Sequence, residues 1–384
     1  MRTPIRITDS RAAGVGSISV EYSNACPFNA DNSRLLLQHA GGFFGLYDGA
    51  GKYVRLMERP VTHSSEPRWS RRNPDVMYFI DKNALWMEHP STGQRALIHV
   101  FSEYIASTAG GRHGVHGRGE SDISEDDGHL VLAGIRPQGG VDVFVYEIST
   151  RTKGPVFPQA RPFDGLKLTG DNKALVSGAE GVFVLDDLAK PPRRIFSGSS
   201  PHAAPIGPYF IVTNSNESPT TLPDFPNGIV RIDTRNGEQL GLLSLPWIDA
   251  VHISTAAGLD WCAVGSYGAK QPSGKVYKVM IDGSGAEMLA DGINSYVQDG
   301  NYTAQPKASV SRDGSRLAYT SDKDGALDVW MLMLDGAVVV PPAPVQPPEP
   351  QLREIDFTAD EGRKWQWHFE VINGKMTVKV YDER

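Results

Sequence analysis

The sequence predicts an all-β protein that folds as a seven-bladed β-propeller, and three observations support this. One strand–turn–strand unit recurs along the chain about every 40 to 50 residues, which is the period of propeller blades. Side chains within the units alternate with period two, as half-buried strands require, and a 3.6-residue helical period is not evident. The 40 glycines and 27 prolines among 384 residues indicate many tight turns.

Three copies of the unit are clear, and four weaker copies bring the count to seven. The clear copies begin with EPRWSRRNPDVMYFID at Glu66, ESDISEDDGHLVLAG at Glu120 and QPKASVSRDGSRLAYTSDKDG at Gln305. Asp-Gly and similar pairs between their strands supply the positive φ angles that two-residue hairpins need. The weaker copies begin at Asn24, Asp164, Pro201 and Val251.

A composition shift near residue 340 predicts the end of the propeller. Six prolines between Pro341 and Pro350 indicate a stiff, extended linker. Two alternating strands then flank Asn373-Gly374, a strong hairpin signal. A lone hairpin is only marginally stable, so it is expected to pack on the propeller, to bind a protein partner, or to begin a further module. The predicted propeller, proline-rich linker and C-terminal β-hairpin extension span residues 1–340, 341–351 and 352–384.

Charge and hydropathy limit the partners. The net charge of -7 argues against nucleic acid as a partner, and the chain lacks the eighteen-residue apolar run of a membrane helix. The first sixteen residues lack the apolar core of a signal peptide, so a cytoplasmic location is the default and the compartment is otherwise unknown.

Cys26 and Cys262, in apolar strand-like contexts, are expected to be free buried thiols. The strand SISVEYS, residues 17–23, is a candidate for closing the ring against the last blade.

Polar residues at the starts of the innermost strands are the candidates for chemistry, because these starts meet at one mouth of a propeller's axial channel. Four histidines hold corresponding places in different units, although a hydrogen-bonded structural role is commoner for any single one. Histidines, arginines, a lysine and a tyrosine around one cavity suit an anionic ligand, with an acidic carbohydrate as the natural candidate. The aligned positions are Asn24, His63 with Glu66 and Arg68, His116 with Glu120, Asp164, His202, His252, and Tyr302 with Gln305 and Lys307.

These residue types match the needs of uronate β-elimination. The reaction requires a base for the proton beside the carboxylate, a positive group or metal for the resulting anion, and an acid for the leaving oxygen. Histidine is a suitable base, arginine or a divalent metal a suitable positive group, and tyrosine a suitable acid. The glycine-rich RHGVHGRGE at 112–120 permits metal binding, but it is more typical of a loop at the channel mouth.

The units EPRWSRRNPD and KASVSRDG resemble TolB-like and WD40-like propeller repeats. The segments from Trp247 and from Asp299 further resemble the last two blades of oligogalacturonate lyases, seven-bladed enzymes that use manganese. In that family the penultimate blade offers a histidine in an H-x-S context, matched here by His252. The last blade offers a glutamine followed by H-P-H-P, where this chain has Gln305-Pro306-Lys307.

The resemblance implies a lyase that cleaves an acidic, uronate-containing saccharide. Pro306-Lys307 replaces both last-blade histidine ligands of the family and puts an ammonium group where its metal would sit, so the Lys307 charge can stand in for the cation. A similar frame occurs in ulvan lyases, where histidine and tyrosine act as acid and base. The predicted cofactor is a divalent metal (manganese or calcium) at His252 and Gln305, and otherwise none. The predicted catalytic residues are His202, His252 and Tyr302, and the predicted substrate-binding residues are Arg68, His116, Arg118 and Lys307.

The alternative hypothesis is a non-catalytic propeller that binds a glycan, or a protein partner through the C-terminal hairpin. The altered metal positions and the C-terminal extension favour it. A serine hydrolase is less well supported, because the chain has no G-x-S-x-G elbow, and no G-x-x-x-x-G-K-[ST] phosphate loop is present either.

Overall fold

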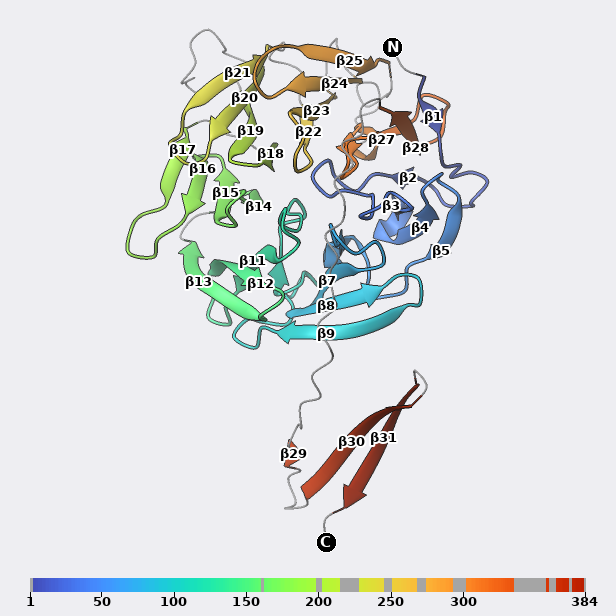
Figure 1. Ribbon diagram of the computed structural model, residues 1–384, viewed down its shortest axis with the longest axis vertical. Coiled ribbons are helices and arrows are strands. Elements are labelled where there is room, and N and C mark those ends of the chain that lie inside the picture. The colour runs from blue at the N-terminus through green and yellow to red at the C-terminus, as the bar shows by residue number, and fades with distance from the viewer. Residues whose placement is uncertain are drawn as a thin grey trace. The chain divides into compact units, whose positions relative to one another are not determined.

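Seven four-stranded antiparallel sheets form a ring about a central axis (Figure 1), which confirms the predicted seven-bladed propeller. The strand nearest the axis begins each blade, and the fourth lies at the rim. The computed structural model describes residues 3–159, 162–197, 202–214, 228–244, 251–267, 274–292, 302–334, 357–358, 364–372 and 375–382.

Blades 1 to 4 follow one another along the chain. Blade 1 consists of β2 (Ile18–Ser19), β3 (Arg34–His39), β4 (Phe44–Asp48) and β5 (Tyr53–Leu56). Blade 2 consists of β6 (Arg68–Trp69), β7 (Met77–Asp81), β8 (Ala84–His89) and β9 (Gln94–Val100). Blade 3 consists of β10 (Val115–His116), β11 (His129–Ile135), β12 (Val141–Glu147) and β13 (Thr152–Gln159). Blade 4 consists of β14 (Gly165–Leu168), β15 (Ala174–Gly178), β16 (Gly181–Leu185) and β17 (Arg193–Phe196).

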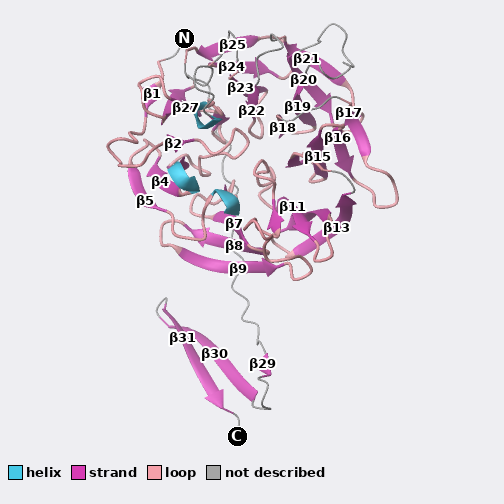
Figure 2. Ribbon diagram, turned by 180° about the vertical axis from the view of Figure 1, so that it is seen from behind, coloured by secondary structure: helices cyan, strands magenta, loops and turns pink. Residues whose placement is uncertain are grey.

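Blades 5 to 7 complete the ring. Blade 5 consists of β18 (Ala203–Ile206), β19 (Tyr209–Asn214), β20 (Gly228–Asp233) and β21 (Gln239–Leu243). Blade 6 consists of β22 (Val251–Ser254), β23 (Trp261–Ser266), β24 (Lys275–Met280) and β25 (Ala286–Ala290). Blade 7 consists of β26 (Ser309–Val310), β27 (Arg316–Ser321), β28 (Asp328–Met333) and the N-terminal β1 (Ile5–Arg6). The helices of the described residues, cyan in Figure 2, are the short 3-10 turns η1 (Ala40–Gly42), η2 (His63–Ser65) and η3 (Tyr302–Ala304).

The ring is closed by β1, which pairs with β28 through Ile5 opposite Met331 and Arg6 opposite Trp330. The expectation that SISVEYS closes the ring is therefore wrong. That segment contains β2, the innermost strand of blade 1. The apolar alternation of SISVEYS was the more visible sequence signal, whereas nothing in the sequence around Ile5–Arg6 marked that segment as a strand of the last blade.

A buried carboxylate fixes this closure. Asp328, which is 0% exposed, accepts hydrogen bonds from the Thr8 hydroxyl at 3.0 Å and the Ser10 backbone N–H at 2.7 Å. The Arg6 guanidinium also donates to it and forms an ion pair at 2.5 Å. Three donors from the N-terminal segment thus satisfy one carboxylate of the last blade, as a buried charge requires.

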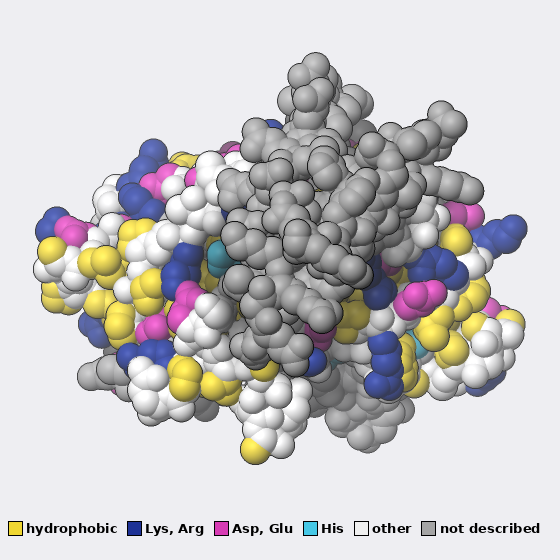
Figure 3. All heavy atoms as spheres, turned by 90° about the horizontal axis from the view of Figure 1, so that it is seen from below, with side chains coloured by type: hydrophobic (Ala, Val, Ile, Leu, Met, Phe, Trp, Pro, Cys, Tyr) yellow, Lys and Arg dark blue, Asp and Glu magenta, His cyan; other side chains and the backbone are white. Residues whose placement is uncertain are grey.

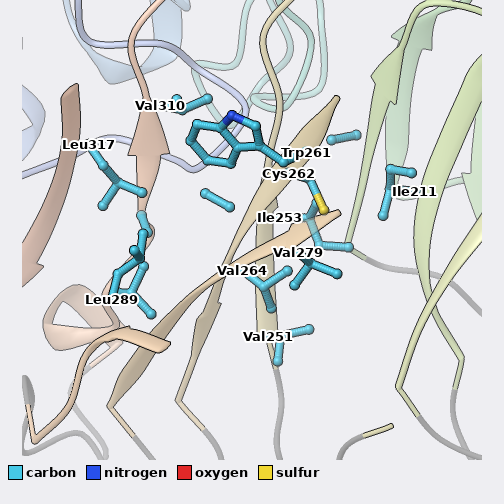
Figure 4. Packing of buried hydrophobic residues seen from close by; sticks show 14 of the residues in the cluster. Ile211, Val251, Ile253, Trp261, Cys262, Val264, Val279, Leu289, Val310 and Leu317 are labelled. Atoms are coloured by element: carbon cyan, nitrogen blue, oxygen red, sulfur yellow. The ribbon is translucent and has the colours of Figure 1, made fainter. Parts of the chain in front are cut away.

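The hydrophobic core lies between the faces of neighbouring blades. Figure 4 shows the part contributed by blades 5, 6 and 7, where Trp261 and Ile253 lie among aliphatic side chains from both sides. Cys262 belongs to this cluster, and both it and Cys26 are free thiols, as expected. Burial raises the pKa of Cys262 to about 12, so this thiol is an unreactive core residue.

Two of the inner strands are interrupted by bulges. In blade 1, Ser19 pairs with Gln38 and Phe28 pairs with Leu35, so nine steps on the inner strand face three on β3, leaving six extra residues. The blade 1 bulge is defined as residues 20–27.

In blade 3, His116 pairs with Ala133 and the Ser124 backbone N–H donates to the His129 carbonyl. Eight steps on the inner strand therefore face four on β11, leaving four extra residues. The blade 3 bulge is defined as residues 117–123. Bulges re-aim side chains, and these two carry polar groups to the innermost strands of other blades.

The chain comprises two compact units, Met1–Pro341 and Pro342–Arg384. The second contains β29 (Phe357–Thr358), β30 (Lys364–Ile372) and β31 (Lys375–Asp382), in which β30 pairs with both neighbours.

No helix among the described residues is long and apolar enough to cross a membrane. On the side shown in Figure 3, the described Lys and Arg side chains are interspersed with Asp and Glu.

Asp328→Ala is expected to lower the free energy of unfolding of the propeller by about 3 kcal/mol, because it leaves the Arg6 charge and two further donors without their shared acceptor. Urea denaturation followed by tryptophan fluorescence measures the change. Asp324→Ala, at an exposed position of the preceding turn, is the matched control and should change stability by no more than about 0.5 kcal/mol. Equal midpoints for the two variants would show that Asp328 does not hold the ring closed.

Candidate functional site

Five side chains from four blades are joined by hydrogen bonds and ring contacts along the inner strands, in a group called the histidine–tyrosine cluster below. His202 lies directly before β18, and His252 lies within β22. The blade 1 bulge contributes Tyr22, the end of β23 is followed by Tyr267, and Gln305 follows η3. The cluster therefore joins blades 1, 5, 6 and 7.

His202 is hydrogen-bonded at both ring nitrogens. Its Nδ1 lies 2.8 Å from the Tyr22 hydroxyl, and its Nε2 lies 2.9 Å from the Tyr267 hydroxyl. Burial lowers the pKa of His202, so the ring is neutral at neutral pH. In a neutral imidazole one nitrogen donates and the other accepts. One phenol therefore donates to His202 while the other accepts from it.

His252 contacts both His202 and Tyr267 through its ring. It is 0% exposed, and its Nε2 lies 2.7 Å from Oε1 of Gln305. The Tyr267 ring stacks on it at 4.6 Å between centroids, and the His202 ring meets it edge-on at 4.6 Å. Burial and the neighbouring His202 hold the pKa of His252 well below its usual range. Its Nδ1 is buried without a hydrogen-bond partner among the described atoms.

Lys307 places an amine beside these rings. Its side chain is buried, and its backbone has a φ of 43°, an uncommon value for a residue other than glycine. Burial lowers the pKa of Lys307 to about 8, while the charge of Glu21 acts in the opposite direction. The positive charge of Lys307 in turn helps to keep His252 neutral. The ammonium form predominates below pH 8, and the free amine above it.

Glu21 and Arg68 form a buried ion pair that anchors the blade 1 bulge. The Arg68 NH1 donates to Oε2 of Glu21 at 2.9 Å, and the side chains are 4% and 5% exposed. The other Arg68 donors bond to the backbone carbonyls of Pro67, Gly119 and Ser121. Arg68, predicted to bind substrate, thus has its guanidinium occupied by protein acceptors.

A second group of residues, called the arginine–histidine pocket below, lies between blade 2 and the start of the blade 3 bulge. Glu66 stands at its base, where the carboxylate accepts the backbone N–H groups of Gly117 and Gly119. Burial raises the pKa of Glu66. The pocket is lined by His63, Ser64, Glu66, Arg112, His113, His116, Arg118, Gly119 and Asp164.

The described residues do not fit the predicted metal site. His252 and Gln305 are hydrogen-bonded to each other, so their lone pairs do not converge on a common ion, and the Lys307 charge lies beside them. No group of three or more His, Cys, Asp or Glu among the described residues is arranged to hold a metal. Divalent ions in proteins take four or more ligands, so the metal stays a prediction without support from this donor set.

The predicted site residues fall into two places. His202, His252 and Gln305 are brought together, with Lys307 beside them. His116 and Arg118 share the arginine–histidine pocket. The Tyr302 side chain lies outside the described part of the chain, so its role stays a prediction.

Sequence reasoning missed Tyr22, Tyr267 and Glu21. Tyr22 and Glu21 lie in a bulge that strand alternation does not reveal, and Tyr267 follows the second strand of its blade rather than the first. The motif G-S-Y-G after an apolar strand is the one signal that could have indicated Tyr267.

Seven four-stranded antiparallel sheets arranged in a ring make this protein a seven-bladed β-propeller. It is similar in structure to an oligogalacturonate lyase from Vibrio parahaemolyticus, with a TM-score of 0.63 and 12% identity over 86% of this chain and 93% of that one. It is also similar to the WD40 domain of Neurospora crassa Pan2, with a TM-score of 0.52 and 13% identity over 87% and 95%.

A third similar structure is hydrazine synthase from Kuenenia stuttgartiensis, with a TM-score of 0.51 and 14% identity over 83% and 97% of the two chains. No protein-family model and no curated protein matches the sequence. Identities of this size show a shared fold alone, because propellers serve unrelated functions.

The histidines are expected to titrate in a defined order. The pKa of His63 should lie above the usual histidine value, because its ring donates a hydrogen bond to Glu21, whereas burial lowers the pKa of His202 and holds that of His252 well below its usual range. Spectra of 15N-histidine-labelled protein recorded between pH 4 and 8 measure this. Glu21→Gln should lower the pKa of His63, because it removes the carboxylate that accepts the hydrogen bond. A protonated His252 at pH 6.5 would contradict the burial described.

Proposed function

We propose that this chain is a polysaccharide lyase-like propeller that cleaves an acidic, uronate-containing saccharide by β-elimination in its channel. The observation that carries the proposal is the Tyr22–His202–Tyr267 hydrogen-bonded triple. It joins two phenols through one neutral imidazole, an arrangement that can supply both the base and the acid of an elimination. The structural similarity to an oligogalacturonate lyase supports the choice of reaction.

In the proposed reaction, one phenol transfers its proton to His202 and then removes the proton beside the substrate carboxylate. The electron pair left on carbon forms a double bond as the adjacent glycosidic C–O bond breaks. The other phenol gives its proton to the leaving oxygen and regains one from His202. Protons and electrons balance, since one saccharide becomes a shorter one and an unsaturated uronide.

Lys307 is proposed to stabilise the anion formed at the substrate carboxylate. Its ammonium group lies beside His252 and is buried, so water screens its field only weakly. No metal-dependent step is needed in this scheme. His252, fully buried beneath the other rings, is a positioning residue that holds the orientation of His202 and Tyr267.

The experiment is a screen of purified protein against pectin fragments, ulvan, alginate and glycosaminoglycans, following the ultraviolet absorbance of the unsaturated uronide. Tyr22→Phe, Tyr267→Phe and Lys307→Met should each lower kcat by about 10²-fold or more. Lys307→Arg should restore part of it. The wild-type rate should fall as the pH rises through about 8, where Lys307 loses its proton.

Two comparisons make this test decisive. Tyr47 lies outside the histidine–tyrosine cluster, and its hydroxyl is hydrogen-bonded to His39. Tyr47→Phe should therefore leave the rate unchanged. Activity that is lost with a chelator and restored by manganese would contradict the role given to Lys307. Full activity in both tyrosine variants would refute the proton relay.

A non-catalytic propeller that binds a glycan or a protein partner is the second candidate. The observation favouring it is that several charges of the inner strands pair within the protein. Lys167 contacts Glu120 at 3.1 Å, and Arg312 contacts Asp122 at 2.7 Å. Such pairing suits a rigid scaffold that presents its faces to a partner.

The binding hypothesis makes a separate prediction for the C-terminal unit. A binding propeller should show affinity for one member of the saccharide panel without turnover. Removal of residues 341–384 should weaken that binding by about tenfold if the hairpin takes part, as measured by calorimetry. Unchanged affinity in the truncated protein would confine binding to the propeller.

A further inference from the structure

We infer that the arginine–histidine pocket is a second subsite, which binds an acidic sugar unit next to the one cleaved at the histidine–tyrosine cluster. This inference rests on the proposed function and names the class of ligand that the site takes. It accounts for the RHGVHGRGE segment, which no catalytic role has used.

The pocket offers an unpaired positive charge. Arg112 is exposed, and its guanidinium makes no hydrogen bond or ion pair among the described residues. Arg118 is fixed by a hydrogen bond to the Phe163 carbonyl and by its position over the Phe163 ring, 4.7 Å from the centroid. Guanidinium groups present paired donors that match a carboxylate or a sulfate.

Two buried polar atoms at the pocket have no partner within the protein. The Nδ1 of His116 and the Nε of Arg118 are both buried and unbonded among the described atoms. Buried polar atoms are nearly always hydrogen-bonded, so these two are available to bond a ligand in the pocket. The backbone here is also strained, because Glu66 and Arg118 both adopt positive φ angles, of 49° and 63°.

The chemistry of the pocket favours an acidic sugar over a bare anion. Burial and the nearby arginines lower the pKa of His116 to about 4, so its ring is neutral and can both donate and accept. The exposed Asp164 carboxylate adds an acceptor. Sugar hydroxyls need hydrogen-bond donors and acceptors together, and the arginines can bind the acidic group of the sugar.

The pocket and the histidine–tyrosine cluster are neighbours. Asp164 lines the pocket, and its charge also acts on His202. His63, on the other wall, lies 3.5 Å from Glu21, the residue directly before Tyr22. A single saccharide chain can therefore contact both places.

The test uses the full chain and oligosaccharides of two to six sugars prepared from pectin, alginate and ulvan. In calorimetry, Arg112→Ala and His116→Ala should each weaken binding of the longer acidic oligosaccharides by about tenfold. Binding of disaccharides should change by less than about twofold. Arg72→Ala, an exposed arginine in the turn after β6, is the matched control and should bind as the wild type does.

The outcomes separate this inference from the proposed function. Weaker binding in Arg112→Ala without any turnover by the wild type would support the subsite and refute the lyase. Turnover with equal length dependence in wild type and Arg112→Ala would retain the lyase and overturn the subsite. Binding of sulfate or phosphate alone, with no preference for acidic saccharides, would also overturn it.

Discussion

The buried ion pair between Glu21 and Arg68 is the interaction on which the channel depends. It fixes the bulge of blade 1 against blade 2, and the same bulge bonds to blades 5 and 7 through Asn24 and Ser23. Removing one partner would leave a buried charge, which costs about 3 to 5 kcal/mol. Tyr22 follows Glu21 directly, so this ion pair also determines where the phenol meets His202.

The electrostatics of the channel follow from burial more than from net charge. Burial lowers the pKa values of His202, His252 and Lys307 together, although the chain as a whole is acidic. Neutral imidazoles can exchange protons with phenols near pH 7, whereas protonated ones could only donate. The cluster therefore retains acid–base capacity because it is enclosed.

The repeat made the fold predictable from sequence, while the site was only partly so. Inner strands are equivalent in a propeller, so residues at equal places in the repeat, such as His202 and His252, could be expected to converge. That reasoning fails where the repeat is broken. The six extra residues of blade 1 leave no periodic signal, and the role of Tyr22 is visible only in three dimensions.

Arg68 illustrates a second limit of predicting site residues from the sequence. Its residue type and its place in the repeat both suggested a substrate contact, yet its partner Glu21 lies 47 residues away in a bulge. Sequence spacing cannot tell whether a charge is met by the protein or left for a ligand, because that depends on the other buried charges nearby.

A near-symmetric ring also constrains where a site can form. Seven equivalent inner strands alone would surround the axis with repeated, similar environments. The two bulges remove that equivalence, since one brings Tyr22 against blades 5 and 6 and the other brings Glu120 and Asp122 against blades 4 and 7. His252 lies on a regular inner strand and His202 directly before one, while Tyr22 arrives on a bulge anchored by an ion pair. Rigid strands give precision and anchored bulges give asymmetry, and a site that must orient one face of a sugar needs both.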